Sequence, residues 1–417
     1  MSSTTPFRQF LSPDDDPRIN ATKDLTPYEY QAAAKHNPFT GGLIEGWSKL
    51  YPAEFVGVTN NGALRKGLYP LTDPLPDERV PIEDMTRAAL AVLDALSDAE
   101  LAKVGHTIDA LEWQSWSNPE FLIHDTGLRL EMLDDAARDA ILGLIEASLS
   151  PEGYQLVRTV MRVNGFLGDI VGLPNIMNEF SYQFSLYGRP SVSEAWGWQL
   201  FGHHVAINCV VVAGKLTMTP LFLGAEPNLI DEGPHRGESA FVARVALAHH
   251  LMASLTPDQR RRATVYEQMV DPAMPEGRIH PGDERALAGA FQDNRVIPYE
   301  GILVTEMSIE SQAIIDAIVT DSLRHLPFGA ASRRYREFGE HIDETWFSWI
   351  GGHQPEDVLY YRIQSPVAIF ELDQHSGVWL NNRVPAQFHI HTVERTPNGN
   401  DYGRAFIRAF ERSRPQA

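Results

Sequence analysis

Apolar and polar residues recur along the chain with two different periods, and the changes of period divide it into blocks. Between residues 81 and 190 apolar residues return at helical spacing, as in the stretch EDMTRAALAVLDAL. Ser97 followed by Glu100 is a typical capping box, and Ser150 followed by Pro151 is a typical helix start. We therefore predict a mainly helical block over residues 81–190.

The period shortens to two in two later blocks. Residues 194–225 are rich in Val, Ile, Trp and Phe, and VVVAGKLTM within them predicts a hairpin with Gly214 in the turn. Residues 357–395 contain VLYYRIQSPVAIFELDQ and AQFHIHTVER, whereas residues 238–330 return to helical spacing. This separation of helix blocks from strand blocks predicts an α+β fold in which helices surround a mostly antiparallel central sheet.

The beginning of the chain has a different character. Residues 1–80 are polar and rich in proline, and they mix glycine with aromatic residues, so we expect an irregular segment that wraps the surface. Residues 81–417 would then form a single α+β catalytic module. The 417-residue chain is 43% apolar and 22% charged, which is enough apolar material for a large core.

Charge and cysteine content narrow the classes of function. The formal net charge of −20 disfavours a nucleic-acid or anionic-membrane partner, because both need a basic surface. The single cysteine, Cys209, permits no disulfide within the chain and no cysteine-based zinc site. The first residues lack the apolar stretch of a signal peptide, and no apolar run is long enough for a transmembrane helix. We expect a cytoplasmic protein with a small-molecule substrate, and homo-oligomer formation stays open.

Four histidines in the strand blocks are the strongest chemical signal. His389 and His391 alternate in a predicted strand, so they share one face at a spacing of about 7 Å and are placed to bind one metal ion. His203 and His204 are adjacent and would face opposite ways in a strand, unless a bulge at Gly202 turns both inward. All four are metal-ligand candidates if the two strand blocks meet. The alternative is a set of structural histidines that pack within the sheet.

Carboxylates near these histidines are candidate ligands or general bases. Glu371, Asp373 and His375 alternate and share one face of a predicted strand, where they mark either a solvated edge or a site. Glu226 lies at a strand end just after the predicted hairpin and is a rival carboxylate. Any of these three carboxylates, Glu226, Glu371 or Asp373, would complete a histidine site as a fourth ligand or as a base.

Charged residues on and after the H-x-H strand suggest supporting roles. Arg395 shares a face with His391 and, together with Arg362, would anchor an anionic group of the substrate. Asp401 follows the turn sequence Asn-Gly and would either orient a histidine or cap the terminal helix.

Histidine and carboxylate ligands without cysteine suit one divalent transition metal, namely Zn, Fe(II) or Mn. Two histidines with one carboxylate favour Fe(II) and oxygen chemistry, whereas three protein ligands with an open position suit catalytic zinc. The chain contains no G-x-S-x-G, G-x-G-x-x-G or Walker A motif, so nucleotide-dependent chemistry has no support.

Five long motifs resemble the DUF3500 family of uncharacterised proteins from bacteria and fungi: WGWQLFGHH, TPLFLGAEP, HIDETWFSWIGG, YYRIQSPVAIFELD and HIHTVERTPNGNDYG. The resemblance runs from about residue 110 to the C-terminus and implies a single module. It implies no activity, and the histidine-bearing motifs correspond here to His203, His204, His389 and His391.

These observations lead us to expect a metal-dependent enzyme that acts on a small carboxylated or aromatic molecule, with hydrolysis as the first choice because it needs no second cofactor. An Fe(II)-dependent oxygenase or lyase is the nearest alternative. A binding protein in which the histidines form a structural network is the alternative from another class.

Overall fold

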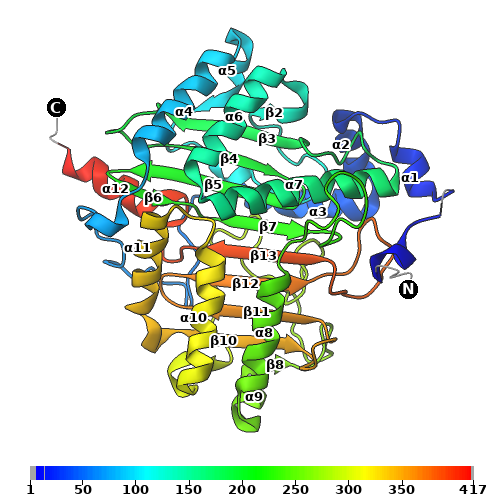
Figure 1. Cartoon of the computed structure of the whole chain (residues 1–417), viewed down its shortest axis with the longest axis vertical. Coiled ribbons are helices and arrows are strands. Elements are labelled where there is room, and N and C mark those ends of the chain that lie inside the picture. The colour runs from blue at the N-terminus through cyan, green and yellow to red at the C-terminus, as the bar shows by residue number, and fades with distance from the viewer. Residues whose placement is uncertain (1–5, 14, 415–417) are drawn as a thin grey trace.

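The computed structural model of the chain describes residues 6–13 and 15–414. Twelve α-helices and one large sheet make up this part of the chain, which confirms the predicted α+β class (Figure 1). The helices are α1 (Pro17–Thr22), α2 (Pro27–His36), α3 (Pro38–Leu50), α4 (Ile82–Ala95), α5 (Asp98–Val104), α6 (Asp135–Ser148), α7 (Pro151–Val171), α8 (Val242–Ser254), α9 (Pro257–Ala263), α10 (Ile309–Leu323), α11 (Phe328–Gly339) and α12 (Arg404–Ser413).

The sheet contains thirteen strands among the described residues, and its main path runs β1-β3-β4-β5-β7-β13-β12-β11-β10-β8. Neighbouring strands are antiparallel except for the outer pairs β1–β3 and β10–β8. The strands are β1 (Gly105–His106), β2 (Leu128–Arg129), β3 (Tyr182–Gly188), β4 (Trp196–Gly202), β5 (Val205–Val212), β6 (Lys215–Thr217), β7 (Leu221–Ala225), β8 (Thr264–Tyr266), β9 (Ile302–Leu303), β10 (Trp346–Gly351), β11 (Leu359–Gln364), β12 (Ile369–Gln374) and β13 (Ile390–Arg395).

The two predicted strand blocks meet at the centre of this sheet. Strand β7 of the first block pairs with β13 of the second, so that Gly224 lies opposite His391. On its other side β7 pairs with β5, which places Val205 opposite Leu223. Residues near 204 and residues near 390 are therefore neighbours across a single intervening strand.

Each face of the sheet carries its own apolar core. Helices α7, α8 and α10 lie across one face (Figure 1), and Ile390 packs into the core beneath them. Val393 points the other way, into a second core that α2, α3 and irregular segments cover. Since side chains alternate along a strand, His391 shares its face with Val393. The histidines thus belong to the face that is covered mainly by loops and by the N-terminal helices.

The N-terminal segment is more regular than its composition indicated. Residues 17–50 form helices α1, α2 and α3, and each has proline at its first position, which is already favourable for a helix. Thr26 and Glu29 close a capping box at the start of α2. The prediction of irregular structure over residues 1–80 was wrong for this stretch, because its prolines follow N-cap side chains and begin helices instead of breaking them.

Other boundaries also differ from the predicted blocks. Strand β3 lies inside the block predicted as helical, and β10 lies outside both predicted strand blocks. The block predicted as helices over 238–330 contains an irregular stretch, residues 267–301, between β8 and β9. This stretch is rich in glycine, proline and charged residues, and its backbone is held by buried side chains of the sheet.

Candidate metal centre

His203 and His204 form the two-residue turn between β4 and β5. Gly202 pairs with Val205 across this hairpin, so neither histidine belongs to a strand. His204 has a φ of 64°, in the left-handed region that residues other than glycine rarely adopt. The turn, rather than a bulge in a continuous strand, brings both imidazoles to the same side, where their rings stack 3.9 Å apart.

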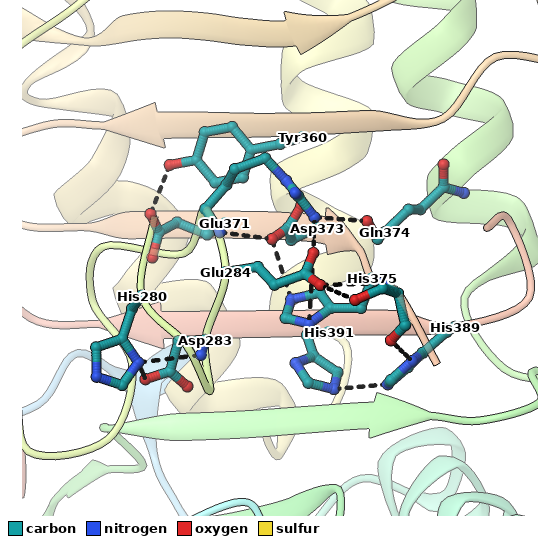
Figure 2. A network of polar contacts seen from close by, with 12 residues as sticks. His280, Asp283, Glu284, Tyr360, Glu371, Asp373, Gln374, His375, His389 and His391 are labelled. Atoms are coloured by element: carbon teal, nitrogen blue, oxygen red, sulfur yellow. Dashed lines mark hydrogen bonds and ion pairs between the residues drawn. The ribbon is translucent and has the colours of Figure 1, made fainter. Parts of the chain in front are cut away.

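His389 and His391 lie on one face, as their spacing predicted. His391 belongs to β13 and His389 directly precedes it, and their Nε2 atoms lie 3.0 Å apart. Figure 2 shows the two rings pointing toward each other from this strand. The Nε2 atom of His204 lies 3.3 Å from that of His389 and 3.2 Å from that of His391. Three imidazole nitrogens from two distant segments therefore converge on one point.

A glycine in the intervening strand makes this convergence possible. Gly224 of β7 lies opposite His391 in the sheet, and its amide donates a hydrogen bond to the carbonyl oxygen of His204 (2.8 Å). A Cβ atom at Gly224 would lie 2.8 Å from Cδ2 of His204 and 3.0 Å from Cδ2 of His391. Any larger residue would occupy the space in which the two rings lie.

Without a cation, the three nitrogens conflict with one another. Burial holds the pKa of His204, His389 and His391 well below its usual range, so all three rings are neutral. The Nδ1–H of His389 donates to the carbonyl oxygen of Ser376 (2.8 Å), which leaves a lone pair on its Nε2. Among three neutral nitrogens at hydrogen-bond distance, at least two must both carry a proton or both carry a lone pair.

A metal ion at the centre of the triangle would remove this conflict. Nitrogens bound to tetrahedral zinc at about 2.0–2.1 Å lie roughly 3.3–3.4 Å from one another. The separations of 3.0, 3.2 and 3.3 Å found here are close to that value. His204, His389 and His391 therefore fit one ion bound on one side by three imidazoles.

His203 is held outside this triangle in a defined tautomer. The side-chain nitrogen of Asn164 donates to the Asn178 carbonyl oxygen (2.8 Å) and to the Ser181 hydroxyl (2.9 Å), so its side-chain oxygen faces His203. That oxygen accepts from Nδ1–H of His203 (2.7 Å). Burial lowers the pKa of His203 to about 3. The ring is therefore neutral, and Nε2 has a free lone pair.

All four histidines line one pocket of about 590 Å³. Its inner end is formed by the histidines, His375 and Glu284, and its outer wall by residues of α1, α2 and α3. Aromatic and aliphatic side chains predominate in the outer part, as in typical small-molecule sites. They are Leu25, Tyr30, Phe39, Leu43, Phe121 and Trp379.

Glu226 lies behind His389 rather than beside its Nε2. One of its carboxylate oxygens accepts from the backbone N–H groups of Val378 (3.2 Å) and Leu380 (3.3 Å) and lies 3.8 Å from Nδ1 of His389. Burial raises the pKa of Glu226 to about 8. The position of Glu226 suits a role in orienting His389 more than a role as a ligand.

Glu371 anchors a loop. Its two oxygens accept from the backbone N–H groups of Leu287 and Ala288, each at 2.9 Å, and the Tyr360 hydroxyl donates to it at 2.6 Å. The carboxylate is buried and does not line the pocket. Its bonds hold the segment near residue 287 against β12.

Asp373 lies in the network next to the triangle (Figure 2). It accepts from the backbone N–H (3.0 Å) and from Nε (2.7 Å) of Arg285, and one of its oxygens lies 3.0 Å from Nε2 of His375. Glu284 pairs with the same arginine and lines the pocket. Asp373, His375 and Glu284 are close enough to hold a second cation, but Arg285 already forms ion pairs with both carboxylates.

The remaining predicted residues lie away from the pocket lining. Arg362 bonds to Glu300 (2.8 Å), and Arg395 bonds to Asp293 (2.5 Å) and lies 3.3 Å from Asp401. Burial raises the pKa of Asp401 to about 6, and the neighbouring Arg395 opposes this effect. Asp401 also accepts from the backbone N–H of Thr396 (2.7 Å), which closes the turn after β13.

Several residues of the pocket were not expected from the sequence. Glu284 reaches it from an irregular segment that flanks the sheet, and Asn118 and Glu120 reach it from a loop. Tyr30 comes from α2, whose capping box was the one available signal. Loop residues of this kind carry no periodicity, so nothing in the pattern of the sequence places them.

Fold and site together define an α+β protein with three convergent histidines at the inner end of an apolar pocket. Residues 78–404 match the family described as "Protein of unknown function (DUF3500)", and the chain belongs to this family. No curated protein and no solved structure matches it. In the part of the chain that the structure covers, every helix is too short or too polar to cross a membrane.

Proposed function

We propose that the protein is a metal-dependent hydrolase of a small organic molecule, with the ion bound by His204, His389 and His391. The observation that carries the proposal is the triangle of three neutral Nε2 atoms at 3.0–3.3 Å. Such a cluster is unfavourable without a cation and has the donor type and spacing of a three-histidine zinc site. One divalent transition metal is the implied cofactor.

The open side of the site favours hydrolysis. Three protein ligands leave a coordination position for water, and a bound metal lowers the pKa of such a water enough to make hydroxide available near neutral pH. In the reaction the water oxygen bonds to the carbonyl carbon of the substrate, and the bond to the leaving group breaks. The leaving group takes up the proton that the water loses.

Two neighbouring side chains are suited to hold water and substrate. His203 offers its Nε2 lone pair as a hydrogen-bond acceptor beside His204, and its ring is fixed by Asn164. Asn118 lines the pocket, and its side-chain oxygen is buried without a hydrogen-bond partner among the described residues. Both would contact a substrate that reaches the histidines.

An Fe(II)-dependent oxygenase or lyase is supported less well. The common iron site combines two histidines with one carboxylate. The cluster of possible ligand atoms around His204 contains histidines alone among the described residues, and the nearby Glu226 contacts the opposite side of His389. The donor set therefore favours zinc, and metal identification tests the choice.

Metal analysis together with an ester and amide hydrolysis screen tests the proposal. Purified protein should contain about one zinc ion per chain, and His389→Ala should lose both metal and activity. His250→Ala is the matched control, since His250 is exposed on α8 outside the pocket. Wild-type protein that takes up neither Zn, Fe(II) nor Mn would refute the proposal and would favour a structural histidine network.

A further inference from the structure

The outer wall of the pocket contains a carboxylate that has no cationic partner among the described residues. Arg18, Glu120 and Glu284 are the lining residues of formal charge that the structure describes, histidines aside. Arg18 is held by Asp16, with 2.9 Å between Nη2 and Oδ2, and Glu284 pairs with Arg285. Glu120 forms no ion pair with any described residue, so its negative charge is available to a cationic group bound in the pocket.

Aromatic rings surround this carboxylate. The Tyr30 hydroxyl donates to Glu120 at 2.6 Å, and the Tyr30 ring lies 6.5 Å from Phe121 and 6.4 Å from Trp379, centroid to centroid. Phe121 and Trp379 are each 5% exposed. The Trp379 side chain also lines the pocket, and its indole N–H, like the Tyr30 hydroxyl, acts to lower the pKa of Glu120.

An unbalanced carboxylate among aromatic rings is costly unless a cation approaches it. Burial accordingly raises the pKa of Glu120, while the bond from Tyr30 opposes that effect. A positively charged nitrogen would interact favourably with both the carboxylate and the aromatic rings of this wall. The carboxylate attracts it by charge, and the aromatic faces attract it by cation–π interaction. An anionic group would meet repulsion from Glu120 and no free guanidinium.

We propose that Glu120, Tyr30, Phe121 and Trp379 form a subsite for a positively charged nitrogen, so that the substrate is an ammonium-bearing molecule. The proposal rests on the hydrolase function for the reaction, but binding at this subsite does not need the metal. It replaces the carboxylated substrate expected from the sequence, because the arginines expected to anchor it, Arg362 and Arg395, do not line the pocket.

The subsite and the histidine triangle line the same pocket. The Asn118 carbonyl oxygen accepts from the backbone N–H of His204 at 3.3 Å, and Glu120 follows two residues later. Two residues of chain span at most roughly 7 Å. A small molecule with its ammonium group at Glu120 would therefore extend along the pocket toward the histidines.

Calorimetric titration of the full-length protein after metal removal tests the subsite separately from the reaction. The probes are choline, its neutral isostere 3,3-dimethyl-1-butanol, and benzoate. Wild type should bind choline roughly tenfold or more tightly than the isostere and should bind benzoate least. Glu120→Gln should bring the ratio of the choline and isostere affinities close to one. Glu112→Gln, which removes a carboxylate eight residues earlier in the chain and outside the pocket lining, should leave the ratio unchanged.

Equal affinity of wild type for choline and the isostere, tighter binding of benzoate, or no binding of any probe would each overturn the subsite. A preference for choline that survives Glu120→Gln would overturn it as well. Because the wild-type comparison needs no variant, a poorly folding Glu120→Gln protein does not remove the test. Choline selectivity in a protein that binds no metal would refute the hydrolase proposal alone.

Discussion

Substitution of Gly224 by alanine probes the site without altering any ligand. The new Cβ would lie 2.8 Å from Cδ2 of His204, 2.9 Å from the Ile390 carbonyl oxygen and 3.0 Å from Cδ2 of His391. Carbon atoms in favourable contact lie about 3.5–4.0 Å apart, so both rings must move by several tenths of an ångström or more. Overpacking of this kind costs roughly 1–3 kcal/mol of folding stability.

The movement of the rings should weaken metal binding as well as stability. Because His204 and His391 would be pushed from the common centre, we expect zinc affinity to fall at least about tenfold, or roughly 1.4 kcal/mol. The assays are denaturant unfolding of metal-free protein and competition titration with a zinc chelator. Gly143→Ala in α6 is the control, since its Cβ would meet no atom within 4 Å. Wild-type zinc affinity in Gly224→Ala would refute the role assigned to this glycine.

Four further variants test the site, the core, a buried ion-pair network and a buried acid. His389→Ala should lose metal and activity with little change in melting temperature, whereas Ile390→Ala, which empties part of the core, should lose roughly 2–5 kcal/mol in denaturant unfolding but still bind metal; the reverse pattern would contradict the assignment. Arg395→Ala should destabilise by roughly 3–5 kcal/mol, because it leaves the carboxylates of its buried pairs uncompensated, and unchanged stability would contradict a structural role. Burial raises the pKa of Glu394 from 4.5 to about 8, so the folded protein keeps a proton there that the unfolded chain loses. Its contribution to stability should be full below pH 4.5 and should decline by at most about 1.4 kcal/mol per pH unit up to pH 8. Glu394→Gln should remove that slope from urea-unfolding curves, and an unchanged slope would contradict it.

The periodicity of the sequence correctly predicted features that depend on residues close together in the chain. The alternation of His389 and His391 gave their common face correctly, and the two strand blocks do pair through β7 and β13. The capping box at Ser97 and the helix start at Ser150 were likewise confirmed. These features depend on residues within a few positions of one another, so a single sequence contains them.

The turn at His203 and His204 was missed because the apolar alternation continues on both sides of it. Positive φ is uncommon for residues other than glycine, and no Asn-Gly signal marks the hairpin. The metal centre therefore depends on a backbone conformation that the sequence does not signal. Backbone conformations of this kind are common at functional sites.

Long-range pairing explains the remaining differences. The partners of Glu371 are backbone N–H groups 83 and 84 residues away, and Tyr30 meets Glu120 across 90 residues. Arg395 bonds to Asp293, which is 102 residues away. Such contacts determine whether a buried charged residue belongs to a binding site or to a structural ion pair. The spacing of residues in the sequence does not predict contacts over these distances.

Anomalous diffraction from crystals grown with zinc tests the central claim most directly. Data collected on both sides of the zinc absorption edge should show one strong peak about 2.0–2.1 Å from Nε2 of His204, His389 and His391, on the side open to the pocket. A fully occupied zinc site elsewhere, with the three imidazoles still 3.0–3.3 Å apart and no peak between them, would contradict it.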